Sequence, residues 1–511
     1  MSAFAPSADM SDARAQNLAL ALIAVFVLAR LALMPLLGFG QDEAYTLVVS
    51  RKLALSYFDH PPLHQWIAHY TALEFGETVW ARLPFVLLFA ATTWLMFALT
   101  RNLFGASAGL IALVALNLSP YFLVSAGGWV TPDGPLLFCL AAAALTLSRL
   151  FFEPTDRREA WRLWLLAGLF LGLAGLSKYS AALTAVGVFA FLIIGPRQRR
   201  WLGDPAFYAG VLVAAAIVSP VFIWNAEHSW ASFAFQGGRG SPGQHLRPAQ
   251  VVAMLLGEIA YLTPWIFAAL VGALADSARR VRRGDDKRLF LLWLALPPIV
   301  VFTVTPLWGA RGLPHWPMPG WFFAYPLMGA WLVEPWAHRL DLKRWAIGTA
   351  ALMAALAALG VWQSATGGLS RLIGGAQTSG DPTLEALPWT KLADAPALLP
   401  RPDFVVTRKW WEAGKVGVAL GRDVPLFVFS NDPRGVAFLD DSARFIGRDA
   451  VIVVPGAQAE EAQAQLKDYF ERFDPPQFVA LGRDGRDEVR LALIPAHVLT
   501  RAFPVPYPLK P

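Results

Sequence analysis

Two adjacent carboxylates, Asp42 and Glu43, stand where a long apolar stretch of the sequence ends. Seventeen residues after Asp42 comes Asp59-His60-Pro61-Pro62, in which an acid and an imidazole precede a Pro-Pro turn. Carboxylates and imidazoles are the side chains that most often move protons in enzymes. Their position after an apolar run predicts a reaction site built against a membrane surface. The alternative is that the acid pair only marks the end of a helix.

The element that must position this acid pair is the apolar run Leu18 to Leu37, which is long enough to cross a bilayer core of roughly 30 Å. Of the 511 residues, 56% are hydrophobic and 16% are charged. In a soluble domain, about 45–50% of the residues are hydrophobic and about 25% are charged. A mean hydropathy of +0.45 and 21 tryptophans, which favour membrane interfaces, therefore indicate a polytopic membrane protein with some soluble mass. The single cysteine, Cys139, excludes a disulfide framework and a cysteine-based metal site.

Eleven apolar segments are expected to cross the membrane, and the fifth, sixth and tenth are shorter or more interrupted than an ideal span. Their ranges are 17–37, 79–100, 105–124, 134–151, 161–176, 180–195, 206–224, 250–274, 289–306, 317–333 and 345–364. We therefore predict a polytopic α-helical fold of about 11 or more transmembrane helices over residues 17–366. Residues 1–16 lack the features of a cleaved signal peptide, so the first span is expected to stay as an anchor.

Alternate loops are strongly basic, and lysine and arginine favour the cytoplasmic side. These loops contain Arg101; Arg157, Arg158 and Arg162; Arg197, Arg199 and Arg200; Arg279 to Arg288; and Arg339, Lys343 and Arg344. Their positions predict a cytoplasmic tail over 1–16 and an outer, periplasmic location for everything after the last span. Lipid topology also explains the net charge of +6 better than nucleic-acid binding does.

The remaining loops carry isolated ionisable or polar residues among Pro, Gly and Trp. Besides the first outer loop, they hold Asp133, Lys178-Tyr179, Asn225, Arg239, Arg311 and His315. Functional groups collected on one face are typical of an enzyme at the outer membrane surface, although interfacial loops share the Trp and Pro content. Lys178 fits that plainer interpretation poorly, because an ionisable group at the membrane is costly unless it is paired or used. Asp133 has an alternative role as a helix cap.

The long loop 41–78 is amphipathic, and its stretches 44–55 and 62–75 are expected to be helices lying in the membrane interface. Three basic residues here break the charge pattern and are expected to be structural or lipid-contacting: Arg51, Lys52 and Arg82.

From about Gly367 short apolar runs replace long ones, which predicts a small periplasmic α/β domain over 367–511. Strands are expected at 404–406, 425–429, 451–454, 478–481 and 489–494, and helices at 410–420 and 459–473. The most site-like stretches are Trp410-Trp411-Glu412 and Ser430 to Gly435. For the second, a plain connection after a strand is the favoured interpretation, and contact with an acceptor is the alternative.

The sequence lacks a Walker A loop, a Gly-rich dinucleotide fingerprint and the HExxH zinc motif. An enzyme on the outer face has no cytoplasmic nucleotide sugars, so its activated substrate is expected to arrive within the membrane as a lipid-linked sugar. Such a transfer needs a base for the acceptor hydroxyl and cations for the leaving phosphate. Asp42 is the candidate base. The candidate phosphate-binding residues are His60, Lys178, Arg239, Arg311 and His315.

The order of short motifs resembles that of the bacterial branch of the protein O-mannosyltransferase superfamily, which includes the aminoarabinose transferases of lipid A. The motifs are Asp42-Glu43-Ala44-Tyr45, Asp59 to Leu63, Arg82-Leu83-Pro84, Thr131-Pro132-Asp133, Ser177-Lys178-Tyr179 and Pro314 to Pro317. The resemblance covers about residues 17–333. It implies a GT-C fold, a polyprenyl-phosphate sugar as donor, and often a C-terminal periplasmic domain.

The resemblance also implies catalytic roles for Asp42 and its neighbour Glu43. His60 stands where the aminoarabinose transferases carry a lysine, a departure that leaves open a different donor sugar. We expect substrate contacts from Tyr45, Asp59, Asp133, Tyr179 and Asn225.

The sequence therefore predicts an inverting glycosyltransferase of the bacterial inner membrane, acting at its outer face. It would move a sugar from a polyprenyl phosphate to a hydroxyl or phosphate of an envelope lipid, glycan or protein. A divalent metal is possible, but no ligand spacing demands one. The alternatives are a transporter or flippase of polyprenyl lipids or glycolipids, and a non-catalytic membrane scaffold. A transporter should carry ionisable groups in mid-span and related halves, and the sequence shows neither clearly.

Overall fold

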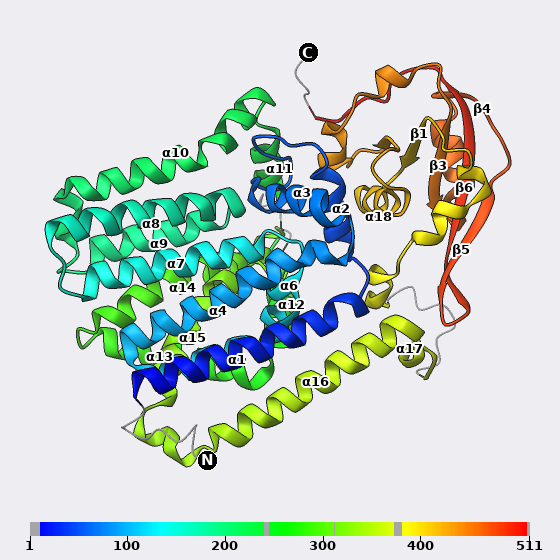
Figure 1. Cartoon of the computed structure of the whole chain (residues 1–511). Coiled ribbons are helices and arrows are strands. Elements are labelled where there is room, and N and C mark those ends of the chain that lie inside the picture. The colour runs from blue at the N-terminus through cyan, green and yellow to red at the C-terminus, as the bar shows by residue number, and fades with distance from the viewer. Residues whose placement is uncertain (1–10, 240–244, 311, 373–380, 508–511) are drawn as a thin grey trace.

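The computed structural model describes residues 11–239, 245–310, 312–372 and 381–507. A bundle of long helices fills one part of the molecule, and a small sheet domain packs against one end of the bundle (Figure 1). The bundle helices are α1 (Asp12–Leu33), α4 (Leu83–Phe104), α5 (Ala106–Asn117), α7 (Asp133–Phe152), α8 (Arg157–Ser177), α9 (Ala181–Ile194), α10 (Pro205–Glu227), α12 (Pro248–Leu262), α13 (Pro264–Val281), α14 (Asp286–Val304), α15 (Met318–Leu332) and α16 (Leu342–Thr366).

The expected count of 11 membrane spans is not confirmed. Among the described residues, seven helices are long and apolar enough to cross a membrane, or nine if two bent pairs each count as one span. The segment 105–124 bends by 85° between α5 and residues Tyr121–Gly128, and 250–274 bends by 106° between α12 and α13. Both bends contain a proline, Pro120 or Pro264, which lacks the N–H that would continue the helix. The expected spans at 180–195 and 317–333 are the shorter helices α9 and α15.

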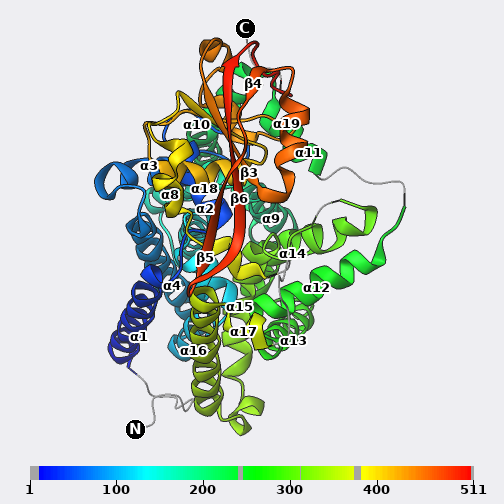
Figure 2. The same ribbon diagram turned by 90° about the vertical axis from the view of Figure 1, so that its right-hand side faces the viewer.

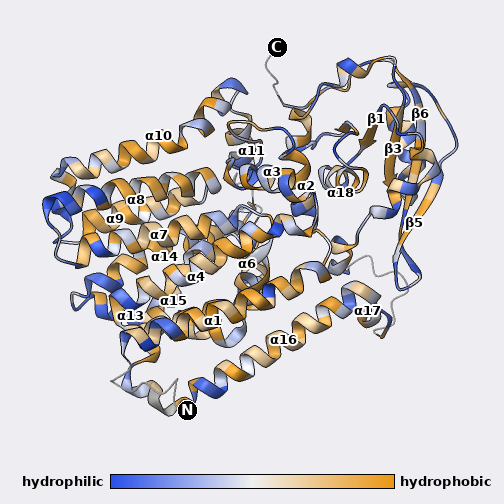
Figure 3. Ribbon diagram, in the orientation of Figure 1, coloured by the Kyte–Doolittle hydropathy of each residue, from blue (hydrophilic) through white to orange (hydrophobic). Residues whose placement is uncertain are grey.

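The two ends of the bundle differ in polarity. The helix ends away from the sheet domain are hydrophilic, whereas the helix bodies are apolar (Figure 3). Arg101 lies in the last turn of α4, and Arg157 begins α8. The basic loops that were expected on the cytoplasmic side therefore belong to this polar end. At the other end, α2 (Gln41–Val49), α3 (Leu63–Phe75) and α11 (Ala231–Arg239) lie between the bundle and the sheet domain (Figure 1).

Helix α2 is not the interfacial helix expected over 44–55. It ends at Val49 and is buried from Glu43 onward. It packs against α18 (Trp410–Leu420) of the C-terminal domain, by which we mean residues 381–507. A Cβ at Gly414 would lie 2.5 Å from the Tyr45 backbone nitrogen, so only glycine allows this close crossing. The C-terminal domain therefore covers the helix that begins with the acid pair.

The three basic residues that break the charge pattern, two in the loop 41–78 and one just after it, are structural. Arg82 forms a buried ion pair with Glu43, and Arg51 pairs with Glu77 at 2.7 Å. Lys52 donates to the backbone carbonyls of Phe438 and Leu439 in the C-terminal domain.

The C-terminal domain is built on a six-stranded mixed sheet in the order β2-β1-β3-β6-β4, with β5 also paired to β6. The strands are β1 (Phe404–Thr407), β2 (Leu426–Val428), β3 (Ala450–Pro455), β4 (Phe470–Phe473), β5 (Gln477–Arg483) and β6 (Arg486–Leu499). Strand β1 is parallel to β2 and β3, and β6 is antiparallel to its neighbours. Figure 2 views this sheet in front of the helix bundle.

One expected helix, 459–473, is wrong in its second half. Helix α19 covers Ala459–Leu466, and Phe470–Phe473 form strand β4. Residues Phe470, Arg472 and Phe473 pair with the long strand β6, so tertiary pairing decides the conformation of a segment that is compatible with a helix.

Candidate functional site

The two carboxylates of the acid pair have opposite surroundings. Glu43 is 1% exposed and bonds to Arg82 through both oxygens, at 2.8 and 2.6 Å. It also accepts the backbone N–H groups of Val130 and Gly40. Glu43 therefore ties the start of α2 to the membrane helices, and its oxygens have no capacity left for a substrate. Asp42, one residue earlier, has a side chain that is accessible to solvent.

Asp42 lies near three cations drawn from distant parts of the chain: Lys178, Arg239 and Arg434. Although solvent reaches Asp42, protein encloses it closely enough that burial raises the pKa of its carboxyl, and these cations lower that pKa only in part. A carboxylate with a raised pKa is a stronger base than an ordinary aspartate. Two acids pair with these cations: Asp133 with Lys178, and Asp59 with Arg434. We call Asp42, the three cations and these two acids the charged cluster.

Lys178 is the cation of the charged cluster at the end of α8. Its ammonium lies 2.8 and 3.0 Å from the two carboxylate oxygens of Asp133, which begins α7. Asp133 is therefore the partner of Lys178, and the N-cap position that it could have taken belongs to Pro132. An ammonium has three donors, so Lys178 keeps one for another ligand.

Arg239 ends α11 and stacks its guanidinium over the Trp316 ring at 4.8 Å and the Phe235 ring at 5.5 Å. Trp316 directly follows His315, so the Pro314 to Pro317 motif meets α11 at the charged cluster. Arg311, predicted beside this motif, lies outside the described residues.

The two predicted site histidines are close to the cations. Burial lowers the pKa of His60 well below its usual value, and His64 and Lys178 lower it further. Burial, together with Lys178, likewise lowers the pKa of His315 to about 4. Both imidazoles are therefore neutral at pH 7 and can offer a hydrogen bond, but no positive charge, to a phosphate.

Tyr45 and Asp59, predicted as substrate contacts, are bonded to each other at 2.5 Å. The Tyr45 hydroxyl also accepts the Gly435 backbone N–H at 2.7 Å, and Asp59 lies 3.4 Å from Arg434. These residues join the first outer loop to the C-terminal domain. The sequence did not single out Arg434 as a site residue, although the turn that carries it, Ser430 to Gly435, was noted as site-like.

Tyr179 and Asn225 organise the base of α11. The Tyr179 hydroxyl bonds to Ser232 at 2.7 Å, and the fully buried Asn225 side chain accepts the Phe233 backbone N–H. Both residues therefore fix the helix that presents Arg239. The described part of the chain holds no group of three or more His, Cys, Asp or Glu residues that could hold a metal ion.

Two apolar grooves approach the charged cluster from different sides. One, of about 440 Å³, lies among α8, α9 and α10 and reaches Tyr179, next to Lys178. The other, of about 370 Å³, lies among α1, α16 and the segment 120–129, and reaches Gly38 and Gly40, just before Asp42. Their apolar linings suit hydrocarbon chains.

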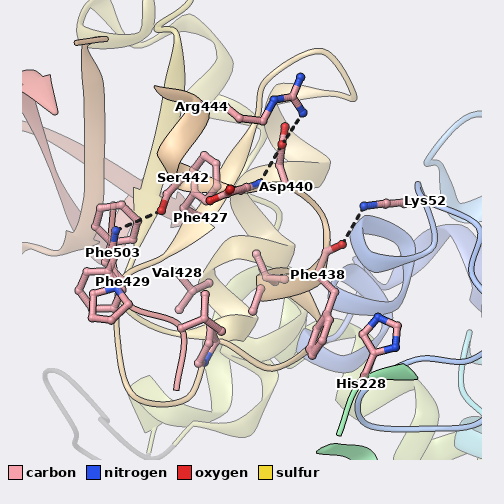
Figure 4. A pocket seen from close by; sticks show the side chains of 16 residues that line it. Lys52, His228, Phe427, Val428, Phe429, Phe438, Asp440, Ser442, Arg444 and Phe503 are labelled. Atoms are coloured by element: carbon pink, nitrogen blue, oxygen red, sulfur yellow. Dashed lines mark hydrogen bonds and ion pairs between the residues drawn. The ribbon is translucent and has the colours of Figure 1, made fainter. Parts of the chain in front are cut away.

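A further cavity, of about 350 Å³, lies between the C-terminal domain and the end of α10 (Figure 4). Its polar groups are bonded within the protein: Lys52 to the Phe438 carbonyl, Arg444 to Asp440, and Ser442 to the Phe503 N–H. We interpret this cavity as part of the seam between the two halves of the molecule.

Comparisons with known proteins agree with this architecture. Residues 59–224 match the model of the dolichyl-phosphate-mannose-protein mannosyltransferase family. The lipid A galacturonosyltransferase RgtD of Rhizobium johnstonii is 26% identical over 342 residues, covering 63% of this chain and 66% of RgtD. The lipopolysaccharide core galacturonosyltransferase RgtA of the same organism is 29% identical over 235 residues, covering 45% of each chain. The match thus spans two thirds or less of these relatives.

Among solved structures, ArnT from Cupriavidus metallidurans bound to undecaprenyl phosphate superposes with a TM-score of 0.63 at 15% sequence identity. The match covers 93% of this chain and 98% of that one, and the apo form of ArnT gives a TM-score of 0.60. The likeness shows that the C-terminal sheet domain belongs to the shared fold. The chain therefore has the GT-C fold of membrane glycosyltransferases, and its sequence is similar to members of that superfamily.

Proposed function

We propose that this protein transfers a hexuronosyl residue from a polyprenyl phosphate to the lipid A or core region of lipopolysaccharide, with Asp42 as the general base. The observation that carries the proposal is the charged cluster: one accessible carboxylate among three cations, with two apolar grooves that reach Tyr179, next to Lys178, and Gly40, two residues before Asp42. The sugar and acceptor classes come from the two galacturonosyltransferases that the sequence resembles.

The chemistry follows from the positions of the charges. Asp42 takes the proton of an acceptor hydroxyl as its oxygen attacks the anomeric carbon. The bond between that carbon and the phosphate oxygen breaks, and the phosphate leaves with the bonding electrons. Lys178 and Arg239 stabilise the charge that develops on the phosphate, assisted by hydrogen bonds from the neutral His60 and His315. Attack opposite to the leaving group inverts the anomeric centre.

Each groove is assigned to one lipid substrate, the donor or the acceptor. The groove that ends beside Lys178 suits the polyprenyl chain of the donor, because it brings the donor phosphate to the ammonium. The groove that ends at Gly40 suits the acyl chains of the acceptor, because it brings the acceptor hydroxyl to Asp42. Glu43, whose oxygens are all bonded, acts as a positioning residue for Asp42.

The charged cluster opens at the bundle end opposite the basic loops. Since basic loops favour the cytoplasm, this arrangement supports a reaction site and a C-terminal domain on the periplasmic face of the inner membrane.

A transfer assay with purified full-length protein tests the proposal. It combines polyprenyl-phosphate galacturonic acid with lipid A or core acceptors, and mass spectrometry detects the product. We expect a glycosylated acceptor with the wild type and loss of the product with Asp42→Asn. Equal product from the two proteins would remove Asp42 from the mechanism. Movement of intact donor across a vesicle membrane, without transfer, would favour a flippase.

A further inference from the structure

Arg434 reaches the charged cluster from the C-terminal domain. It follows strand β2 in a turn that lies against the first outer loop, and one of its terminal nitrogens is 3.4 Å from a carboxylate oxygen of Asp59. The guanidinium lies over the Trp410 ring at 4.0 Å and 5.7 Å from the Phe235 ring of α11. Arg434 is thus held between the two halves of the molecule, mostly by aromatic faces.

The backbone around Arg434 is fixed in an uncommon conformation. Arg434 has a φ of +47°, which is disfavoured for a residue with a Cβ. Its N–H donates to the Tyr507 hydroxyl at 3.3 Å, and the next N–H, of Gly435, donates to Tyr45. A Cβ at Gly435 would lie 2.6 Å from the Tyr45 hydroxyl, so the turn fits closely onto α2. Strained residues held this firmly are concentrated at ligand sites.

Most of the hydrogen-bonding capacity of Arg434 is unused within the described residues. A guanidinium has five N–H donors in a planar fork. The bond to Asp59 is long, and the Asp432 carboxylate is 3.6 Å from Nε, beyond hydrogen-bond distance. The buried Nε has no hydrogen-bond partner in the part of the chain that the structure describes. A planar fork with free donors is suited to a carboxylate or phosphate.

Arg434 and Lys178 come from different halves of the molecule, and Arg434 shares the Phe235 ring with Arg239. Two ion pairs flank Asp42: Lys178 with Asp133 in the helix bundle, and Arg434 with Asp59 at the C-terminal domain. Arg434 acts on the charge of Asp42 more strongly than Lys178 does. The charged cluster therefore offers a further cation, from the C-terminal domain, beside the cations assigned to the donor phosphate.

We propose that Arg434 binds the carboxylate of the transferred hexuronic acid, so that the C-terminal domain selects an acidic sugar. The proposal rests on the proposed function. In a hexuronic acid the carboxylate is carried by the ring carbon bonded to the ring oxygen. It therefore lies close to the anomeric carbon, which the acceptor oxygen deprotonated by Asp42 attacks. A neutral hexose has no charge to offer the guanidinium, which makes Arg434 a means of discrimination between donors of the same shape.

The test compares two donors, polyprenyl-phosphate galacturonic acid and polyprenyl-phosphate galactose, with Arg434→Asn. Asparagine tolerates a positive φ, so this variant removes the charge while keeping the turn. We expect kcat/KM for the acidic donor to fall about 10- to 100-fold, mainly through KM, as for loss of a charge-assisted hydrogen bond. The value for the neutral donor should fall much less, because only the acidic donor loses a charged partner, and Arg434→Lys should restore part of the loss.

Arg472→Asn is the matched control, because Arg472 is an exposed arginine of the same domain, paired with Asp474 at 2.6 Å. It should leave both donors unaffected. An equal loss of both donors in Arg434→Asn, or no loss of either, would overturn the proposal. So would a loss that appears only with phosphorylated lipid A and not with its dephosphorylated form, since Arg434 would then bind the acceptor. A wild type inactive with every donor would overturn the proposed function, and this inference with it.

Discussion

The two faces of the first turn of α2 show how one sequence motif provides two kinds of carboxylate. On the face toward the membrane helices, Glu43 is sealed in an ion pair with Arg82 and holds two backbone N–H groups. On the other face, Asp42 is open to solvent and surrounded by cations that it does not bond to directly. Adjacent positions on a helix point about 100° apart, so a single residue step separates a structural anchor from a candidate base.

Asp42→Asn should have the largest effect on activity of any change at this turn. The amide cannot accept the acceptor proton, so kcat is expected to fall about 10²–10⁴-fold. Stability should stay the same or rise, because the change removes a charge whose pKa burial has raised. Single-turnover assays and thermal melts of the purified protein measure the two properties. A loss of activity that is matched by unfolding would contradict the separation of roles.

In the wild type, activity should decline as the pH falls through the pKa of Asp42, because only the ionised carboxylate is a base. Since this pKa is raised, the acid limb of the pH–rate profile should lie above the ordinary aspartate value of about 3.9. An acid limb at or below that value would argue against Asp42 as the titrating group.

Glu43→Gln should show the opposite pattern. It removes the counter-charge of the buried Arg82, whose other partners are backbone carbonyls, and this loss costs about 3–5 kcal/mol of unfolding free energy. The protein that remains folded should keep most of its activity. Chemical denaturation in detergent measures the loss, and Glu74→Gln, at an exposed position on α3, is the matched control. A pair of apolar residues at positions 43 and 82 should recover much of the stability.

The sequence could predict the importance of the first turn of α2, but not which residues contact it. The acid pair after an apolar run located Asp42, and the positions of Lys178 and His315 in the outer loops located two of its neighbours. The Glu43–Arg82 pair joins residues 39 positions apart, and Arg434 reaches Asp59 across 375 positions. Such pairings depend on how α18 docks on α2, which no local pattern encodes. The turn Ser430 to Gly435 is a polar stretch after a strand, and a plain connection was the favoured interpretation of that pattern.

The fold was predicted in a similar way, reliably where patterns are long and less so where they are short. All the expected apolar segments are helical, and five expected strands are present. The bends at Pro120 and Pro264 were readable as prolines inside apolar runs, but whether a proline kinks a helix or breaks it depends on its neighbours. Strand β4 forms only because β6 offers a partner.

Tyr45→Phe tests the contact between α2 and the C-terminal domain. We expect a smaller loss of stability than for Glu43→Gln. The change removes the hydroxyl that donates to Asp59 and accepts the Gly435 N–H, so the Gly435 N–H loses its acceptor and Asp59 keeps only its long contact with Arg434. A loss of about 1–3 kcal/mol follows from the buried groups. Activity should fall through a misplaced Arg434, and the acid limb of the pH–rate profile should move to higher pH, because Arg434 lowers the pKa of Asp42. Tyr70→Phe, at a ring 63% exposed on α3, should change neither property.

The smallest effect is expected where a charged pair is exposed. His497 lies between Asp449 and Asp474, at 2.9 and 3.0 Å, on the surface of the C-terminal domain. Hydrogen bonds to the two carboxylates raise the pKa of His497 above its usual 6.5. A raised folded-state pKa means that the stabilisation is complete below about 6.5 and is lost as the pH rises through the folded-state value.

Because the pair is exposed, His497→Gln should cost only about 0.2–1 kcal/mol at pH 5 and nearly nothing at pH 8.5. Thermal melts of the wild type and the variant at the two pH values measure this difference, and added salt should reduce it. A cost that grows with pH would contradict the assignment. A cost at pH 5 as large as that of Glu43→Gln would mean that burial is not what separates a structural ion pair from a superficial one, and the contrast between the two faces of α2 would then lose its physical basis.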